Sequence, residues 1–470
     1  MYGTRLRDTF EPVLTGRMFV LAAFLLFGLG DGVAAAHSER QLIPQRDTPH
    51  QVREFVDSMG VAAHLNYFDT AYGNFPLVQQ RLKELGIRHV RDGAQLISPD
   101  YDRRLYDSWI GLADAGVHID LVLDPRESLK QITPQKLKTI DSFSGGGVIE
   151  SLEGPNELDI SGIPNWPSAA RDYQKLIWSV ASNTPGFKNI PVYGPSMAQA
   201  ANASRMGDLS PYVTEGNLHP YPGGNLPSII FPSQPSLMAS TYPNRKLVFT
   251  ETGYHNALAD HSDQPGVSES AAAKYIPRIF LEDFNHGIAR TFLYELFDEK
   301  PNPELTDNQK HFGLLRSDGS RKPAFIALRN MIAILNRDSQ AGNVRQATLS
   351  YVAAGMTPEI HHTLLIKRPG VYDLILWREV SSFDLKSEKD IANTKRTVQL
   401  GFPSPPARVL LFDPLTGGDR LSQASGRSTY EIDVPDSPVI VEIQFGSHSE
   451  ISPNRAHAEK PPTASGSSSR

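Results

Sequence analysis

The stretch that decides the fold is Ser-Leu-Glu-Gly-Pro-Asn-Glu-Leu-Asp (Ser151–Asp159), which follows the apolar segment Gly147-Val148-Ile149. The apolar segment predicts a buried strand, and the proline-bearing segment after it predicts a polar loop. A carboxylate at such a junction is held rigidly by the strand and still faces solvent, as a positioned acid or base requires. Glu157 is therefore the first candidate catalytic residue, and it needs a partner elsewhere in the chain.

The same layout recurs from about Gly60 onward: a short apolar run, a polar or Gly/Pro-containing turn, then a segment with helical spacing. Strands that alternate with helices pair in parallel, because a crossover helix returns the chain to start the next strand in the same direction. Eight such units over about 280 residues match the size of a (β/α)8 TIM barrel. The main competitor, a doubly wound open sheet, lacks its Gly-x-Gly-x-x-Gly turn after the first strand. The eight predicted strands are Val61–Asn66, Ile87–Arg91, His118–Leu123, Val148–Leu152, Pro191–Gly194, Glu215–His219, Lys246–Thr250 and Ala289–Tyr294.

Apolar residues three or four positions apart predict the helices between these strands. In residues 75–85 the spacing is followed by Gly86, a typical helix stop. The same spacing occurs at Leu105, Trp109, Leu112 and Ala113, at Tyr173, Leu176, Ile177 and Val180, and at Tyr275, Ile279, Phe280 and Phe284.

The composition changes after Asn336, where helical spacing gives way to short β-rich runs separated by turn signals such as Arg368-Pro369-Gly370. This pattern predicts a C-terminal antiparallel β-sandwich. The expected division is therefore a signal peptide at 1–36, a segment at 37–59 that is a candidate for an additional sandwich strand, a catalytic barrel at 60–340, a sandwich at 341–446 and a disordered tail at 447–470. The predicted sandwich strands are Thr348–Val352, Thr363–Lys367, Val371–Trp377, Thr397–Leu400, Arg408–Phe412, Ser428–Ile432 and Pro438–Ile443.

The N-terminus has the layout of a secretory signal peptide: three arginines by position 17, an apolar run from Met18 to Leu29, and small residues up to Ala36, after which cleavage is expected. The apolar run is too short to span a bilayer as a helix. We therefore expect a secreted or periplasmic protein with no stable membrane anchor after cleavage.

Because the chain contains no cysteine, no disulfide is possible and stability must come from a large core.

The charge pattern limits the class of partner. A formal net charge of -6 without basic blocks argues against nucleic acid, whose phosphates require a Lys/Arg-rich face. His361-His362 lacks further ligands at metal spacing, so no metal site is predicted. A neutral or small partner, with neither metal nor cofactor, is the expectation.

A second carboxylate occupies the equivalent position on the seventh predicted strand, which ends in Glu251. In a barrel the C-terminal strand ends share one rim, so Glu157 and Glu251 can face each other across the mouth. A glycosidase needs one carboxylic acid to protonate the leaving oxygen and one carboxylate to attack or stabilise the sugar cation. Period-two alternation places His219 and Tyr221 on one side of the sixth strand end, and Arg91 ends the second strand.

These neighbours predict how the two acids differ. An arginine and a tyrosine hydroxyl beside Glu251 would favour its ionised form, whereas Glu157, without such help, is expected to hold its proton. Glu251 would then be the nucleophile and Glu157 the acid.

Asn156-Glu157 at strand four, His219-Pro220-Tyr221 at strand six, Glu251 at strand seven and Arg91 at strand two together resemble the retaining glycoside hydrolases of clan A. His311–Leu315 followed by Arg321–Phe325 resembles that clan's approach to its last helix. The resemblance covers about Val61–Leu335, and a barrel followed by a sandwich is similar to family 39 and related two-domain members. It implies Glu157 as acid/base, Asn156 as donor to the sugar 2-hydroxyl, Glu251 as nucleophile, and Arg91 and Tyr221 as its hydrogen-bond partners.

The sequence departs from the clan pattern at two places. Leu158 follows the acid/base glutamate where many members have proline, and Tyr294 stands at the end of strand eight where many have tryptophan. Tyr294 is the candidate for that substrate-binding position. Trp166, in the loop after strand four, is a candidate for stacking on a sugar ring, with ordinary loop packing as an equal alternative.

Simpler interpretations remain open for several residues. Arg91 could pair with a structural acid, and His219 could be a hydrogen-bonded core residue. Glu150, Glu153 and Asp159 lie at the wrong spacing from the strand end, so solvated or capping roles are expected for them.

The sequence thus predicts a secreted retaining hydrolase of β-linked oligo- or polysaccharides. An inverting hydrolase, a transglycosylase and a non-catalytic carbohydrate-binding protein are the alternatives.

Overall fold

The structure is a computed structural model that describes residues 43–446 except 127–128, 263, 343 and 346–347. The predicted signal peptide (1–36) and the predicted tail (447–470) lie outside the described residues. Within the described residues, no helix combines the length and apolar character needed to cross a membrane.

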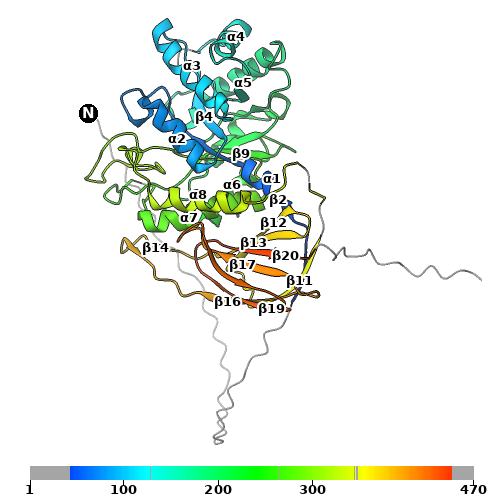
Figure 1. The fold of residues 1–470 in the computed structure, drawn as a ribbon. Coiled ribbons are helices and arrows are strands. Elements are labelled where there is room, and N and C mark those ends of the chain that lie inside the picture. The colour runs from blue at the N-terminus through cyan, green and yellow to red at the C-terminus, as the bar shows by residue number, and fades with distance from the viewer. Residues whose placement is uncertain (1–42, 127–128, 263, 343, 346–347, 447–470) are drawn as a thin grey trace, which may run out of the picture. The chain divides into compact units, whose positions relative to one another are not determined.

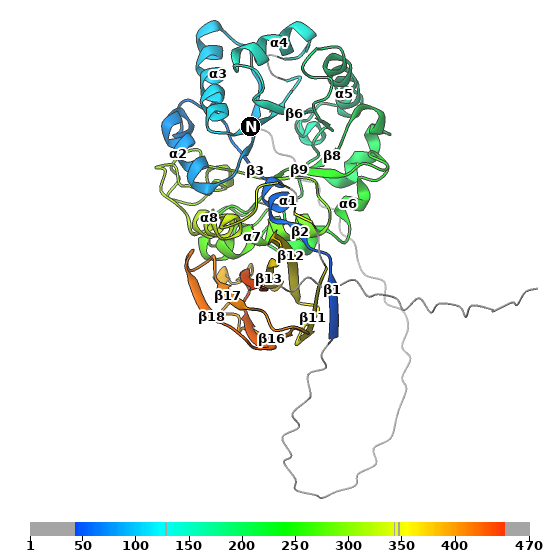
Figure 2. The ribbon, with the colours of Figure 1, turned by 45° about the vertical axis from the view of Figure 1, so that its right-hand side comes forward.

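Eight strands form one parallel sheet in the order β7-β6-β5-β4-β3-β10-β9-β8. Its outermost strands approach each other through a parallel bridge between Tyr193 and Glu215, which curls the sheet into a barrel (Figures 1 and 2). The predicted barrel is therefore confirmed, with each strand overlapping its predicted run. The strands are β3 (Met59–Ala62), β4 (His89–Gly93), β5 (His118–Val122), β6 (Ile149–Glu153), β7 (Val192–Tyr193), β8 (Gly216–Leu218), β9 (Leu247–Thr252) and β10 (Thr291–Leu293).

The barrel helices begin at polar caps, several followed by proline. Asn74, Ser98, Thr133 and Ser268 each accept a hydrogen bond from a backbone amide in the first turn of the helix that follows. Such caps satisfy amides that have no partner within the helix, and proline is tolerated there because its missing donor is not needed. The helices are α1 (Val52–Asp57), α2 (Phe75–Leu85), α3 (Pro99–Asp114), α4 (Pro134–Phe143), α5 (Trp166–Ser182), α6 (Gln234–Leu237), α7 (Glu269–Asn285) and α8 (Pro323–Asn336).

One unit of the barrel departs from the regular alternation. Between β7 and β8 the structure has two 3-10 segments, Ala200–Met206 and Ser210–Tyr212, instead of an α-helix. Gly207 and Pro211 interrupt this region, so a longer helix cannot form. Further 3-10 turns occur at Ala71–Gly73, Leu158–Ile160, Pro227–Ile230 and Asn308–Lys310.

Two antiparallel sheets form the C-terminal sandwich, in the orders β1-β11-β16-β19 and β18-β17-β20-β13-β12-β2, with β2 joining its neighbour in parallel. β1 (Ile43–Asp47) and β2 (His50–Gln51) come from the segment before the barrel and pair with β11 and β12. The other strands are β11 (Leu349–Ala354), β12 (Ile360–Arg368), β13 (Val371–Arg378), β16 (Arg396–Gly401), β17 (Arg408–Phe412), β18 (Arg420–Ala424), β19 (Thr429–Val434) and β20 (Val439–Gln444), with a hairpin of β14 (Phe383–Asp384) and β15 (Lys389–Asp390).

The sandwich and the barrel share a buried boundary along α7. Every residue of β13 is buried, because one face of its sheet meets the other sheet and the opposite face carries contacts to α7. The Ser382 amide donates to the Tyr275 hydroxyl (2.7 Å), and the Asn285 side chain donates to the His362 carbonyl (2.9 Å). Trp109 in the barrel and Trp377 in β13 are fully buried, as core packing predicts.

Candidate active site

The C-terminal ends of the barrel strands bring the predicted polar residues to one rim. Arg91 lies in β4, Glu157 follows β6, and His219 and Tyr221 follow β8. Glu251 lies near the end of β9. Because all eight strands run in the same direction, their C-terminal ends meet around one opening, and residues far apart in sequence become neighbours.

The two glutamates approach closely across this opening. One oxygen of Glu157, one oxygen of Glu251 and a ring nitrogen of His219 all lie within 4.8 Å of one another. The side chains of Glu157 and Glu251 are 20% and 11% exposed, whereas that of His219 is fully buried. The two carboxylates therefore reach solvent over a buried imidazole.

Glu251 is surrounded by hydrogen-bond donors. Arg91 Nη1 donates to its Oε1 (2.5 Å), and the Tyr221 hydroxyl donates to its Oε2 (2.8 Å). Burial, followed by the charge of Glu251, raises the pKa of Tyr221 well above 10.0, so this hydroxyl keeps its hydrogen and stays a donor. Two donors, one of them cationic, make Glu251 a fixed acceptor, as predicted for a nucleophile.

Glu157 also has a partner, which the sequence did not reveal. His219 Nδ1 lies 2.7 Å from its Oε1. Burial acts to raise the pKa of Glu157, but the hydrogen bond and charge of His219 outweigh it, so the pKa lies below 4.5. Burial opposes charge on His219 too, yet Glu251 and Glu157 together raise its pKa above 6.5. The prediction that Glu157 lacks a hydrogen-bonding partner is therefore wrong, and the opposite pKa shifts of the pair favour a proton on the imidazole over one on Glu157.

The backbone at Glu157 adopts a strained conformation. Its φ of 44° and ψ of 48° lie in the left-handed region, which costs a non-glycine residue about 1–3 kcal/mol. The Glu157 amide donates to the Ser196 carbonyl (3.2 Å), so the loop after β7 holds this conformation.

Asn156 is oriented by donors on its oxygen. Oδ1 accepts from Arg91 Nη2 (2.7 Å) and from Ser196 Oγ (3.2 Å). Within the described part of the chain, its Nδ2 has no acceptor. That amide is therefore available to donate to a ligand, in agreement with the role that the resemblance implies.

Tyr294 lies beside the site and Trp166 does not. Tyr294 packs edge-on against Tyr221 (ring centroids 6.5 Å apart), and its hydroxyl lies 3.3 Å from His64 Nε2. Trp166 begins α5, is only 5% exposed, and has the guanidinium of Arg205 over its ring at 4.9 Å. The packing alternative therefore holds for Trp166, and the stacking interpretation is wrong.

The sequence interpretation also missed a buried layer beneath the rim. Glu153 is fully buried and accepts from Arg91 Nε (2.7 Å) and Nη2 (2.8 Å), so the expectation of a solvated or capping role for it is wrong. Arg91 thus pairs with a structural acid and with Glu251 at once. Ser151 and Glu153 lie two positions apart in β6 and so share one of its sides, and Asp120 in β5 pairs with Ser151. This period-two spacing of polar residues was the available signal.

A cavity of about 250 Å³ opens beside Glu251 and Asn156, and its wall combines aromatic with polar side chains. His64 in this wall stacks on Tyr67 (4.6 Å between ring centroids). Burial lowers the pKa of His64 to about 4, so it is neutral at pH 7. The cavity thus offers hydrogen-bonding groups and a neutral ring. Its wall also includes Asn66, Asp92, Gln95, Asp124 and Arg126.

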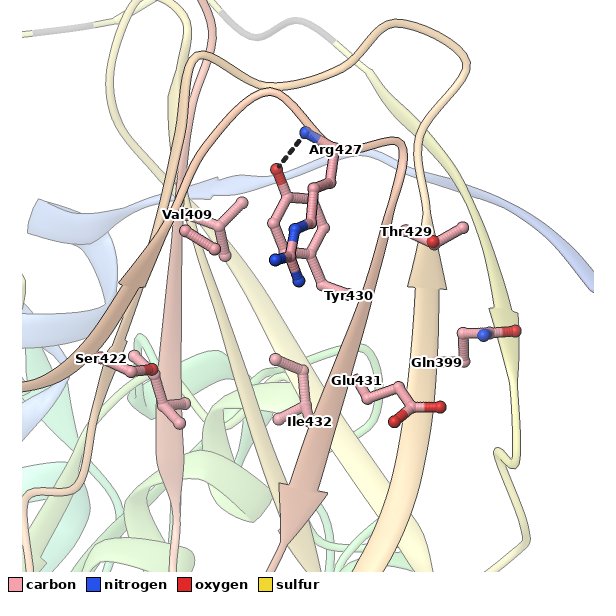
Figure 3. Close-up of a pocket in the computed structure, with 10 residues that line it drawn as sticks. Gln399, Val409, Ser422, Arg427, Thr429, Tyr430, Glu431 and Ile432 are labelled. Atoms are coloured by element: carbon pink, nitrogen blue, oxygen red, sulfur yellow. Dashed lines mark hydrogen bonds between the residues drawn. The ribbon is translucent and has the colours of Figure 1, made fainter.

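A larger cavity of about 420 Å³ lies in the sandwich and differs in chemistry (Figure 3). The Arg427 amide donates to the Tyr430 hydroxyl (3.3 Å), and Val409 and Ile432 contribute apolar surface. Among its lining residues Glu431 is the single carboxylate, so this cavity lacks the paired acids of the barrel mouth.

Within the described residues, three groups of histidine and carboxylate side chains come close enough to consider a metal ion. They are Glu157-His219-Glu251, His64-Glu295-Glu299 and Glu282-His361-Glu379. In the first, protein donors already occupy both oxygens of Glu251, and the guanidinium of Arg91 supplies positive charge beside it. The set therefore fits proton transfer and nucleophilic chemistry better than metal ligation.

Comparisons with known proteins agree on the fold. The chain is similar to a family 39 glycoside hydrolase from the gut symbiont Bacteroides cellulosilyticus WH2 (14% identity, 84% of this chain and 83% of that one, TM-score 0.53) and to a GH39 enzyme from Xanthomonas axonopodis pv. citri (16%, 88% and 100%, 0.55). It is also similar to a monomeric beta-xylosidase from Caulobacter crescentus CB15 (12%, 85% and 98%, 0.56). No protein-family model and no curated protein sequence matches the chain. At these identities the similarities establish the architecture of barrel and sandwich.

Proposed function

We propose that this protein is a retaining glycoside hydrolase that cleaves β-linked glycosidic bonds in an oligo- or polysaccharide. The observation that carries the proposal is the approach of one oxygen of Glu157 and one oxygen of Glu251 to within 4.8 Å. Retaining enzymes hold their carboxyl groups about 5–5.5 Å apart, whereas inverting enzymes need about 6.5–9.5 Å to admit a water molecule between the general base and the sugar. The architecture shared with family 39 glycoside hydrolases supports the same conclusion.

The proposed reaction has two steps. Glu251 attacks the anomeric carbon and forms a covalent glycosyl ester, while Glu157 gives a proton to the departing oxygen. Glu157 then removes a proton from water, whose oxygen attacks the same carbon and releases Glu251. The donors from Arg91 and Tyr221 hold Glu251 in place, and Asn156 Nδ2 is free to donate to a sugar hydroxyl. These steps need neither metal nor cofactor.

The first experiment assays the full-length mature protein on a panel of 4-nitrophenyl β-glycosides and defined oligosaccharides. With the best sugar, Glu251→Ala and Glu157→Ala are each expected to lose activity by roughly four orders of magnitude or more on a substrate with a poor leaving group. Glu431→Gln, in the sandwich cavity, is the matched control and is expected to keep wild-type activity. Full activity in both alanine variants would refute the proposal.

Azide separates the two roles by stereochemistry. In Glu251→Ala a small anion can replace the missing nucleophile, so a dinitrophenyl β-glycoside should give the α-glycosyl azide. In Glu157→Ala the glycosyl ester still forms with this good leaving group, and azide should then give the β-glycosyl azide. NMR of the products distinguishes these outcomes, and identical anomers from both variants would contradict the assigned roles.

Product analysis of the wild-type protein also addresses the alternatives. A transglycosylase would lengthen or rearrange an oligosaccharide, whereas a hydrolase releases a reducing sugar whose new hydroxyl is β in the first minutes. A non-catalytic binding protein would bind oligosaccharide without either product.

We also propose export followed by cleavage after Ala36, on the basis of the N-terminal arginines, apolar run and small residues. Expression of the full-length gene product with fractionation and N-terminal sequencing tests it. A mature N-terminus at His37 in the secreted or periplasmic fraction is the expected result, and an intact N-terminus in the cytoplasm would overturn it.

A further inference from the structure

The Thr250 hydroxyl lies beneath the acid/base pair and connects it to the buried Glu153. Thr250 Oγ1 is 2.9 Å from His219 Nε2 and 3.1 Å from Glu153 Oε1. On the other side of the imidazole, His219 Nδ1 is 2.7 Å from Glu157 Oε1. A continuous chain of hydrogen bonds therefore runs from Glu153 to Glu157.

Counting donors fixes the direction of this chain. A hydroxyl has one hydrogen and two lone pairs. Two acceptors are within reach of the Thr250 hydrogen: Glu153 Oε1, an acceptor because Arg91 donates to both oxygens of that carboxylate, and Asn217 Oδ1 (3.0 Å). The negative charge of Glu153 makes it the stronger acceptor of the two, and neither choice leaves the hydrogen for His219. Asn217 Nδ2 donates to Thr250 Oγ1 (2.8 Å) and fills one lone pair. The second lone pair is left for His219, whose Nε2 must therefore carry a hydrogen.

The same count applies on the side of Glu157. With a hydrogen on Nε2, a neutral His219 presents a lone pair at Nδ1. Two lone pairs cannot face each other at 2.7 Å, so one proton lies between Nδ1 and Glu157 Oε1. Either atom can hold it, and the other then accepts.

We propose that Glu153 is a positioning residue of the acid/base unit. Through Thr250 it fixes a hydrogen on Nε2 of His219, so that Nδ1 of His219 and Oε1 of Glu157 share the single proton that the leaving group takes. The proposal rests on the proposed function for the fate of that proton, which moves from Nδ1 to Oε1 and on to the departing oxygen. No oxidant or further reactant is required.

The charges that face this unit come from several strands. The charges of Glu251 and Arg91 act on His219 in opposite senses, and Asp159 acts on Glu157 as a second negative charge. Burial, with the charge and hydrogen bond of Glu153 added, raises the pKa of Asp120 well above 3.8 and so favours its neutral form. Tyr242, which also faces Glu153, stays protonated because burial raises its pKa. The raised pKa of His219 and the lowered pKa of Glu157 are consistent with a proton that rests on the imidazole before substrate binds.

Thr250→Val tests the chain without changing any charge. The imidazolium loses the acceptor of its Nε2 hydrogen, so it should release its proton at lower pH. The alkaline limb of kcat/KM is expected to move down by about one pH unit, since a hydrogen bond to a charged group has about that effect on a pKa. The expected change in kcat is a loss of about tenfold, with KM little altered, because the affected proton moves only in the chemical step.

Two variants are matched to Thr250→Val. Thr250→Ser keeps the hydroxyl and should return the alkaline limb to its wild-type position. Thr241→Val removes another buried hydroxyl, one without a hydrogen-bond partner in the described residues, and should leave the pH profile unchanged. Glu153→Gln removes one negative charge near the imidazolium and should also move the limb to lower pH. An unmoved limb in both Thr250→Val and Glu153→Gln would overturn the proposal.

Nitrogen-15 NMR of the full mature chain tests the tautomer without turnover. The His219 resonances are those absent from His219→Gln. Above its pKa, wild-type His219 should carry its hydrogen on Nε2, and Thr250→Val should shift the population toward Nδ1. A predominant Nδ1 hydrogen in the neutral wild-type protein would overturn the proposal. If no glycoside were cleaved, the proposed function would fail while this measurement still decided the tautomer.

Discussion

Arg91 at the barrel mouth and Arg278 at the boundary between α7 and the sandwich are both buried against carboxylates, yet they serve different ends. Arg278 Nε donates to Glu379 Oε2 (2.7 Å), and Nη1 donates to the Asp436 carbonyl (3.2 Å). Trp377 Nε1 also donates to Glu379 (3.0 Å). The Glu379 side chain is 2% exposed, against 11% for Glu251.

The difference shows that access, more than residue type, separates a structural ion pair from a reactive one. At the α7 boundary, protein donors meet both oxygens of Glu379, including the Ser228 amide (3.1 Å), and solvent is excluded. At the mouth, donors also meet both oxygens of Glu251, but its side chain lines a cavity and stays partly exposed. A buried pair of this kind stabilises little by itself but is costly to break.

The largest expected effect comes from breaking each arginine in turn. Arg278→Met leaves Glu379 as an uncompensated buried charge and should lower the free energy of unfolding by about 3–5 kcal/mol. The activity of the folded fraction should stay at the wild-type level. Arg91→Met should lower both stability and activity, because Glu153 and Glu251 lose the same partner. Urea unfolding and kcat measured on the folded protein check both.

A second substitution shows whether charge is the cause. Arg278→Met combined with Glu379→Gln removes the unpaired charge and should recover most of the lost stability. If the double variant were as unstable as Arg278→Met, lost packing rather than charge would explain the effect.

A smaller effect is expected from single hydroxyls at the mouth. Tyr221→Phe removes the 2.8 Å hydrogen bond to Glu251 and should reduce kcat by roughly ten- to a hundredfold, as expected for a bond to a charged acceptor. Tyr254→Phe removes a buried hydroxyl that donates to the Asn225 carbonyl (2.7 Å) and touches neither carboxylate. Steady-state kinetics on the two variants should therefore differ, and equal losses would remove Tyr221 from the reaction.

The smallest effect concerns the pH dependence of the α7 boundary. A hydrogen bond to Glu282 raises the pKa of His361 above 6.5, although burial opposes it. A raised folded-state pKa stabilises the protein below the unfolded value of about 6.5, and this stabilisation is lost as pH rises through the folded value. At pH 5.5 the free energy of unfolding of the wild type should exceed that of His361→Gln by less than about 1 kcal/mol, because the pair is partly exposed. At pH 9 the two values should be equal. Unfolding midpoints at the two pH values measure the difference, and a gain confined to pH 9 would contradict the assignment.

Much of the fold could be predicted because its signals are local. Apolar runs bounded by glycine and proline predicted the eight barrel strands, and spaced apolar residues predicted α2, α3, α5 and α7. β18 (Arg420–Ala424) escaped prediction because its side chains are mostly exposed and backbone pairing to β17 alone defines it. The sequence did not predict that the connection between β7 and β8 lacks an α-helix. Gly207 and Pro211 interrupt this connection, and whether such residues prevent a helix depends on the length of the connection.

The candidate site divides in the same way. Glu157 and Glu251 could be proposed because each follows an apolar run, and a barrel brings strand ends together. The roles of Glu153 and Thr250 could not be predicted, because they depend on hydrogen bonds with Arg91 in β4, Asn217 in β8 and His219 after β8. Trp166 had two open interpretations, and only the packing around α5 decided between them.

By itself, the sequence determined the order of strands and helices, the change to a β-rich C-terminal region and the two glutamates at equivalent strand ends. Only the tertiary structure decided that His219 lies within hydrogen-bond distance of Glu157, that Arg91 donates to two carboxylates and that Trp166 is covered. The reason is physical: periodicity acts between residues close in the chain, whereas a hydrogen bond forms between atoms a few ångströms apart in space, which only the closed barrel brings together.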